Sequence, residues 1–441
     1  MPSPRKSKAG PASPRSMQRG IAMAHRETMT SRQRVLTALN HETPDRVPID
    51  LGGFQTGIHR NAYTQLLDHL GIRDEATILD PVQQLARPCE ELLERFHVDI
   101  RYVVAHGPES FKGGIEQNTR DGRLWHDLKD EFGVVWSMPM GPSDCDEGGW
   151  PSQDKGGTPS PHKGRMPSPR GGTGLYMDIS HHPLADATLA DLADYPFPKG
   201  DDPTRFTRLR EQAQTLRRET PYGLSTGIGG VVYEICWYLR GLERWFMDMI
   251  ENPAFCEALL DRTLAFWLGY YTEFLKEIGD LVDVVMIGDD VGGQSGPLFS
   301  PEFYRRVVKP RQKRLVQHIK SLTPAKIWYH TCGSVRSLIP DLLDNGIDIL
   351  NPVQIGAADM DPRNLKAQFG DRLVFWGGGI DTQRVLSFAR PEEVTEHVRR
   401  NLEAFKPGGG YVFNSVHNLQ AGVPPENIVA LFDAAYEHGF Y

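Results

Sequence analysis

Apolar residues along the chain fall into two kinds of segment. Amphipathic segments with apolar residues at helical spacing predict helices at 203–219, 231–277, 301–322, 334–345, 362–369, 391–406 and 424–438. Short apolar runs beside them predict strands in YGLSTG, LVDVVMIGDD, AKIWYH, IDILNPV, RLVFWGG and GYVFNSV. Apolar strands that alternate with amphipathic helices are typical of a parallel sheet covered by helices.

The N-terminal part of the chain continues this alternation. TSRQRVLTALNHETPDRVPID predicts a helix that breaks at Pro44 and runs extended into Ile49, and residues 62–108 end in the extended DIRYVVAH. No G-x-G-x-x-G follows an early strand, and polar residues follow the carboxyl end of strand after strand. We therefore expect an α/β fold, a single-domain (β/α)₈ TIM-like barrel with one active-site mouth.

Two segments depart from the pattern. Residues 1–28 are basic and rich in Pro and Ser but lack the apolar core of a secretion signal, which predicts a disordered tail before a barrel at 29–441. Residues 141–174 turn to Gly, Pro, Ser and Lys, which predicts a surface insertion. A length of 441 residues accommodates one barrel with such an insertion.

Composition limits the cellular compartment and the kinds of partner that we expect. The net charge of −8 is spread along the chain, which disfavours a nucleic-acid partner. The five cysteines are odd in number and scattered, so we expect a reducing compartment rather than a disulfide framework. No run reaches the roughly eighteen apolar residues that span a bilayer. These features predict a cytoplasmic protein with a small-molecule substrate and no membrane partner.

The strongest candidate chemistry is a metal site at the predicted mouth. His330 and Cys332 stand two residues apart at a strand end, so their side chains point to the same side of the strand. Imidazole and thiolate together suit zinc, and His417 after the last strand is a candidate third ligand. Three protein ligands with one open position are typical of catalytic zinc sites. The alternative is a hydrogen-bonded histidine beside an inert cysteine.

Carboxylates and amides at the other strand ends are candidates for handling a substrate. Asp289 and Asp290 are the candidate catalytic residues, although at most one of two neighbours can point along the barrel axis. The candidate substrate-binding residues are Glu234, Gln294, Asn351, Gln354, Asp381 and Asn418. Glu234 is equally plausible as a first-turn helix carboxylate. Glycines 377–379 favour close backbone approach over phosphate binding, because no helix start with Lys-Ser/Thr follows them.

Several longer motifs together carry a family resemblance. They are SRQRVLTALNHETPDRVPID, GDDVGGQSGPLFSPEFYRRVVKPRQKRL, HTCGSVRSLIPDLLDNGIDILNPVQ, LKAQFGDRLVFWGGGIDTQ and FNSVHNLQAGVPPENIVALFDAA. Over roughly residues 29–441 the chain resembles the uroporphyrinogen-decarboxylase-like superfamily, which includes corrinoid-linked methyltransferases. The resemblance implies a (β/α)₈ barrel with its site at the carboxyl-terminal mouth.

The methyltransferase branch is the closer match. There the resemblance implies a zinc ion held by a His-x-Cys pair with further Glu and Cys ligands, and His330 and Cys332 match the pair. His417 stands where the late cysteine is usual, and Gln354 where a glutamate is common. The expected activity is transfer of a methyl group between a small O- or N-methyl compound and a corrinoid on a partner protein.

Two other functions stay open. A metal-free decarboxylase would use an aspartate such as Asp289 to stabilise a cationic intermediate. Uroporphyrinogen decarboxylase itself is less expected, because LGGFQTGIHRNAY stands where an arginine-rich segment would bind the substrate carboxylates. A catalytically silent barrel would hold a small molecule or a corrinoid protein without turnover.

Overall fold

Seven parallel strands form the centre of the molecule. The computed structural model describes residues 27–111, 113–140 and 176–441. The strand order is β14-β13-β12-β11-β10-β9-β4. These strands are β4 (Ile100–Val103), β9 (Gly223–Gly227), β10 (Val284–Gly288), β11 (Lys326–His330), β12 (Ile349–Asn351), β13 (Val374–Trp376) and β14 (Tyr411–Val412). Each coincides with a strand that the sequence predicts.

The segment around Ile49 closes the sheet into a barrel. Ile49 makes a parallel bridge with Phe413, directly after β14. On its other side Ile49 accepts a hydrogen bond from the backbone of Asp99, which precedes β4. This segment therefore occupies the eighth strand position, and the predicted (β/α)₈ barrel is confirmed. Helix α2 (Ser31–Leu39) contacts β4, β9 and β14 and covers the amino-terminal end of the barrel.

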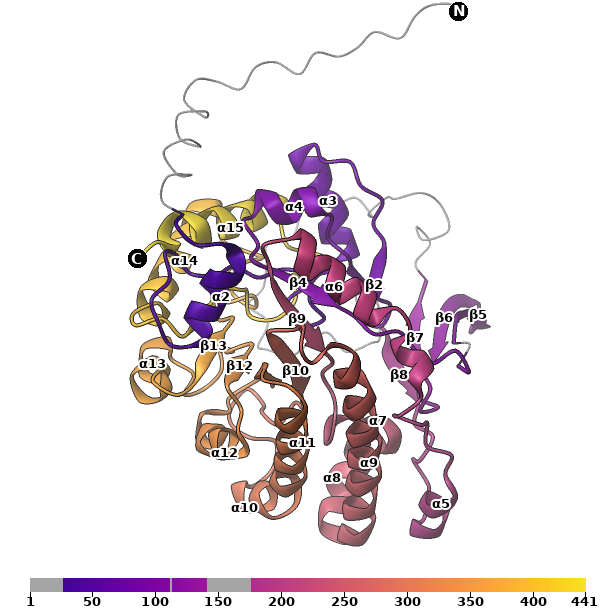
Figure 1. Ribbon diagram of the computed structural model, residues 1–441. Coiled ribbons are helices and arrows are strands. Elements are labelled where there is room, and N and C mark those ends of the chain that lie inside the picture. Colours follow the sequence, from indigo (N-terminus) through magenta and orange to yellow (C-terminus); the bar gives the residue numbers. More distant parts are fainter. Residues whose placement is uncertain (1–26, 112, 141–175) are drawn as a thin grey trace, which may run out of the picture.

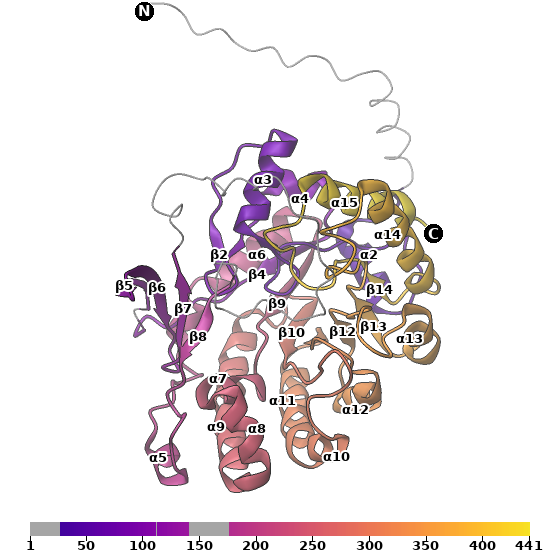
Figure 2. The ribbon, with the colours of Figure 1, turned by 180° about the vertical axis from the view of Figure 1, so that it is seen from behind.

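Helices surround the strands (Figures 1 and 2). The helices that follow α2 are α3 (Arg60–Leu70), α4 (Glu90–Arg95), α5 (Leu189–Asp194), α6 (Leu209–Glu219), α7 (Glu234–Arg240), α8 (Leu242–Glu251), α9 (Pro253–Ile278), α10 (Pro301–Phe303), α11 (Lys309–Leu322), α12 (Ile339–Asn345), α13 (Pro362–Phe369), α14 (Pro391–Phe405) and α15 (Pro425–Gly439). The helices predicted at 231–277 are three, α7 to α9, because Gly241 has a φ of 86° and Pro253 starts a new helix.

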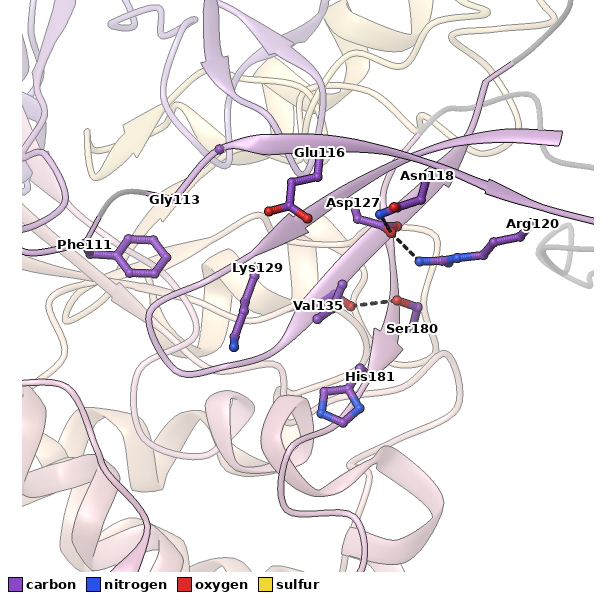
Figure 3. Close-up of a pocket in the computed structure, with 11 residues that line it drawn as sticks. Phe111, Gly113, Glu116, Asn118, Arg120, Asp127, Lys129, Val135, Ser180 and His181 are labelled. Carbon is purple, nitrogen blue, oxygen red and sulfur yellow. Dashed lines mark hydrogen bonds and ion pairs between the residues drawn. The ribbon is translucent and has the colours of Figure 1, made fainter.

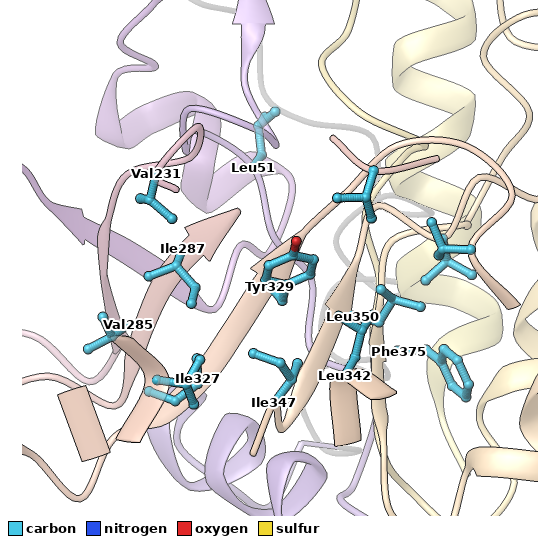
Figure 4. Packing of buried hydrophobic residues seen from close by; sticks show 14 of the residues in the cluster. Leu51, Val231, Val285, Ile287, Ile327, Tyr329, Leu342, Ile347, Leu350 and Phe375 are labelled. Carbon is cyan, nitrogen blue, oxygen red and sulfur yellow. The ribbon is translucent and has the colours of Figure 1, made fainter. Parts of the chain in front are cut away.

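Strand residues alternate between two apolar layers. Outward side chains such as Val285, Ile287, Ile327 and Phe375 pack in the layer between strands and helices (Figure 4). Inward side chains form a separate cluster inside the barrel, which contains Val284, Met286, Trp328, Ile349, Val374, Trp376 and Val412 together with Val35 and Leu39 of α2. Trp328 and Trp376 stack there with ring centroids 4.7 Å apart. The barrel is therefore filled below its mouth.

Two antiparallel sheets lie outside the barrel and were not predicted. One joins β5 (Ile115–Arg120), β6 (Arg123–Lys129), β7 (Val135–Pro139) and β8 (Asp178–His181), on the side of the molecule away from α13 and α14 (Figures 1 and 2). The other joins β1 (Ile58–His59), β2 (Ile78–Asp80) and β3 (Leu85–Ala86). The predicted insertion at 141–174 and residues 1–26 of the predicted tail lie outside the described residues.

None of the described helices combines the length and the apolar character that a membrane crossing requires.

Candidate metal centre

The three predicted metal ligands meet at the barrel mouth. The ligand atoms of His330, Cys332 and His417 all lie within 4.8 Å of one another. The distance from Cys332 Sγ to His330 Nε2 is 3.6 Å. Two ligand atoms at zinc-bond lengths in a tetrahedral site are separated by about 3.5 Å, so this pair is already at a suitable spacing. The nitrogen, sulfur and nitrogen donors fit a zinc ion with an open fourth position.

Asn351 determines which nitrogen of His330 faces the other ligands. The Asn351 side chain donates from Nδ2 to the carbonyl of Trp376, so its Oδ1 is left to accept from His330 Nδ1 at 2.6 Å. The proton of the imidazole is therefore on Nδ1, and the lone pair of Nε2 points toward Cys332. Metal-binding histidines are commonly oriented by such a second hydrogen bond.

Gly288 makes room for His330 on the neighbouring strand. It pairs with His330 in the register of β10 and β11. A Cβ at Gly288 would lie 2.7 Å from the Cβ of His330 and 2.6 Å from its carbonyl oxygen. Gly377 shows the close backbone approach that the sequence predicted, because its φ is 106° and a Cβ there would lie 2.4 Å from the carbonyl oxygen of Pro352.

The two adjacent aspartates point in different directions. Asp289 is fully buried; its Oδ1 accepts from the backbone amides of Tyr233 and Glu234, and its Oδ2 from the Gln312 side chain. Burial raises the pKa of Asp289 to about 7, against the effect of these hydrogen bonds. The geometry makes Asp289 a positioning residue at the start of α7. Asp290 is the carboxylate beside the candidate metal ligands, since its Oδ1 accepts from the Cys332 amide at 2.7 Å and lies 3.9 Å from His330 Nε2.

Glu234 reaches the same region from the first turn of α7. Its Oε1 accepts from the hydroxyl of Tyr238, and its Oε2 from the Asp290 amide at 3.4 Å. Burial and the neighbouring Asp290 raise the pKa of Glu234. Burial likewise raises the pKa of the Cys332 thiol, and the charges of Asp290 and Glu234 raise it further. A bound cation would offset both effects, because it stabilises the thiolate and the carboxylates together.

Burial lowers the pKa of both candidate histidine ligands. The pKa of His417 falls to about 3, and the nearby His330 contributes to the shift. The pKa of His330 is also lowered, although Asp290 acts in the opposite direction. Both imidazoles are therefore neutral at physiological pH, which is the form that binds metals.

The remaining predicted substrate residues mostly bind the protein itself. Gln354 accepts from the Gly333 amide, and Asp381 accepts from the amides of Gln383 and Arg384. Asn418 accepts from the Gly57 amide and donates to Gln83. Gln294 is exposed, and its backbone carbonyl accepts from the Ala358 amide. Among the predicted residues, Asn351 and Asp290 contact the triad directly, and Glu234 acts on Cys332 through its charge.

Sequence reasoning missed Asp50, which follows Ile49 in the segment that closes the barrel. Its Oδ2 accepts from the Tyr102 hydroxyl at 2.8 Å and from Trp376 Nε1 at 2.9 Å. Burial raises the pKa of Asp50 to about 6, although both hydrogen bonds lower it. The pattern that predicted the other site residues, a polar residue at the end of a predicted strand, also applies to Asp50. Tyr176, which contacts Asn418 and Gln420, had no such signal.

A second concave region lies away from the triad, on the β5–β8 sheet. This cavity of about 490 Å³ is lined by residues that include Glu116, Asn118, Arg120, Asp127 and Lys129 (Figure 3). Asp127 accepts from Asn118 and forms an ion pair with Arg120, so the central carboxylate is already satisfied by its neighbours. None of its lining residues belongs to the barrel mouth.

Comparison with known proteins identifies the family. A family model described as uroporphyrinogen decarboxylase (URO-D) matches residues 172–438. The uroporphyrinogen decarboxylase of Psychromonas ingrahamii is 26% identical over 279 residues, which cover 60% of this chain and 74% of the relative. That of Alkalilimnicola ehrlichii is 23% identical over 268 residues, or 58% of this chain and 68% of the relative.

A solved structure supports the barrel. A methyltransferase from Methanosarcina mazei superposes with a TM-score of 0.58 at 19% identity, and the match covers 93% of this chain and 99% of that one. At this identity the likeness concerns the fold alone. The family model spans more than half of the chain, in agreement with the motifs in the sequence, and the protein therefore belongs to the uroporphyrinogen decarboxylase (URO-D) family.

Proposed function

We propose that this protein is a zinc-dependent methyltransferase, which moves a methyl group between a small O- or N-methyl compound and a corrinoid carried by a partner protein. The observation that carries the proposal is the convergence of His330 Nε2, Cys332 Sγ and His417 at the barrel mouth. A decarboxylation has no need of these nitrogen and sulfur ligands, whereas methyl transfer to or from a heteroatom benefits from a Lewis acid.

The residues around the triad have separate tasks in this proposal. Zinc would withdraw electron density from the heteroatom that exchanges the methyl group. Asn351 holds His330 in the ligand tautomer, and Asp289 holds the start of α7 so that Glu234 reaches the mouth. Asp290 and Glu234 would orient the substrate. In the donor direction, the bonding pair of the carbon–heteroatom bond would stay on the heteroatom, and a reduced corrinoid on the partner protein would supply the electron pair for the new bond to the methyl carbon.

Elemental analysis of the purified protein tests the metal centre. We expect about one zinc per chain, and loss of most of it in Cys332→Ala and in His417→Ala. Cys89→Ala is the matched control, because Cys89 is also partly exposed but lies at the start of α4, outside the triad. Retention of zinc in both triad variants, or no zinc uptake by the wild type, would contradict the proposal.

The decarboxylase alternative makes a different prediction. It requires turnover without zinc, and it has support from the names of the curated relatives. The geometry gives it less support, because the oxygens of Asp289 are occupied by the start of α7 and by Gln312. Decarboxylation of uroporphyrinogen by zinc-free protein would favour this alternative over methyl transfer.

A further inference from the structure

Asp50 presents an acceptor oxygen that the described residues leave unused. The side chain is fully buried. Tyr102 and Trp376 both donate to Oδ2. Thr56 and the Leu51 amide also lower the pKa of the carboxyl, but none of the described residues has the geometry of a hydrogen bond to Oδ1. A buried carboxylate oxygen without a donor is costly, so its retention calls for a partner from outside the chain.

A second unused acceptor lies on the adjacent strand end. Asn414 follows Phe413, which pairs with Ile49, and its Nδ2 donates to the backbone carbonyl of Asp50 at 2.8 Å. That bond fixes the amide orientation, so the Asn414 oxygen is Oδ1, an acceptor. Within the described part of the chain, this Oδ1 is also buried without a partner. Two adjacent acceptors without donors match a ligand that carries several N–H donors.

Aromatic side chains lie beside Asp50, since Tyr102 and Trp376 both donate to it. Phe54 and Tyr102 pack against the inner cluster that contains the stacked Trp328 and Trp376. Aromatic faces attract cations, and the hydrogen bond to Trp376 holds one of these rings against the carboxylate. The groups that act on Asp50 within the described residues are neutral, and none of them is Lys or Arg.

Asp50 is connected to the metal centre. Trp376 donates to Asp50 through its indole and accepts from Asn351 through its carbonyl, and Asn351 accepts from His330. Three hydrogen bonds thus lead from the carboxylate to a candidate zinc ligand. The charged groups near Cys332 are negative like Asp50, because Asp290 and Glu234 are the ones that act most strongly on it.

We infer that Asp50 and Asn414 bind a protonated amine, so that the substrate of this barrel is a methylated compound with an ammonium group. The inference rests on the proposed methyltransferase function and names its substrate class. The ammonium group donates to Asp50 Oδ1 and Asn414 Oδ1, and the aromatic rings enclose its methyl or methylene groups. A substrate with many carboxylates does not match this charge distribution.

Ligand-observed saturation-transfer NMR tests the inference with small probes. Dimethylammonium chloride and 2-propanol are close in size, and only the first is a cation. We expect saturation transfer from the protein to dimethylammonium, with binding at least tenfold weaker for 2-propanol. Weak binding is enough for this measurement, since such small probes have few atoms. Equal binding of the two probes would overturn the inference without any variant.

Asp50→Asn keeps the side-chain shape and removes the charge, and we expect it to weaken dimethylammonium binding at least tenfold. The matched control is Asp130→Asn, because Asp130 also accepts from a tryptophan indole, that of Trp136, but lies at the turn before β7. Undiminished binding in Asp50→Asn would overturn the inference. The NMR measurement needs neither zinc nor turnover. Binding of dimethylammonium by a protein that takes up no zinc would therefore contradict the proposed function and leave the amine site standing.

Discussion

Asn351 is the residue on which the ligand form of His330 depends. Replacement by Leu removes the acceptor of the Nδ1 proton and frees the imidazole to rotate or change tautomer. We expect zinc affinity, measured by competition with a chelator, to fall roughly tenfold to a hundredfold. Asn351→Asp keeps an acceptor at the same position and should retain affinity. Unchanged affinity in Asn351→Leu would show that the hydrogen bond does not orient the ligand.

Asp50 gives the protein a stability cost that depends on pH. Its pKa is raised from 3.8 to about 6 in the folded state, so the folded protein takes up this proton more readily than the unfolded chain. Stability therefore falls as pH rises between these two values, by about 3 kcal/mol for a shift of this size. Asp50→Asn removes the cost.

We expect Asp50→Asn to be the more stable protein in urea at pH 7.5, with the difference shrinking toward pH 4. Tyr102 is the other titratable group in direct contact with this carboxylate, and it stays neutral over this range because burial raises its pKa. A variant that is less stable than the wild type at pH 7.5 would show that the charged form is compensated within the fold.

At the scale of elements, the pairing of β10 with β11 brings Gly288 against His330. Gly288→Ala would introduce a Cβ into contact with the backbone and Cβ of His330, so β11 must shift. We expect a loss of about 1 to 3 kcal/mol in urea unfolding together with weaker zinc binding. Gly107→Ala is the control, because a Cβ at Gly107 meets nothing within 4 Å. Equal effects of the two substitutions would contradict this account of β10.

The elements differ in how far their sequences predict them. The barrel strands are apolar on both faces and could be located to within a few residues. Strand β5 is mostly exposed, and apolar and polar residues do not alternate along it. The Asp121-Gly122 turn is therefore the one local signal for its hairpin with β6. The apolar pattern predicted helices at 231–277, and the structure shows that they are divided at Gly241 and at Pro253.

Sequence patterns likewise predict only part of the candidate site. His330, Cys332 and His417 could be placed together because parallel strand ends meet at one barrel mouth. The roles of the amides could not be predicted, because their partners are backbone groups distant in sequence. Asn418, for example, accepts from Gly57, which is 361 residues away. Only the closed barrel brings such groups into contact.

For the whole molecule, barrel closure depends on a buried ionic cluster next to the segment around Ile49. Asp99 is fully buried and accepts from Arg34 of α2 and from Arg46, each at 2.7 Å. It also accepts from the Ile49 amide. We expect Asp99→Asn to lose about 3 to 5 kcal/mol in urea unfolding, because two buried guanidinium groups lose the one fully buried carboxylate that they share and keep only Asp45 and Glu27.

The pH dependence of this cluster has the opposite sign to that of Asp50. Burial acts to raise the pKa of Asp99, but Arg46 and Arg34 outweigh it and lower the pKa. The stabilisation is therefore present above the ordinary aspartate pKa and is lost as pH falls through the lower folded value. Asp433→Asn, which breaks the exposed pair with Arg95, is the control and should change stability by less than about 1 kcal/mol. A loss no larger than this control would contradict the role of Asp99.

The proposed function requires His330, Cys332 and His417 to bind zinc at the mouth of this barrel. X-ray absorption spectroscopy at the zinc edge of the metal-loaded protein measures the ligands directly. We expect one sulfur at about 2.3 Å and two imidazole nitrogens at about 2.0 to 2.1 Å in the wild type. A first shell of oxygen and nitrogen without sulfur in the wild type would contradict it.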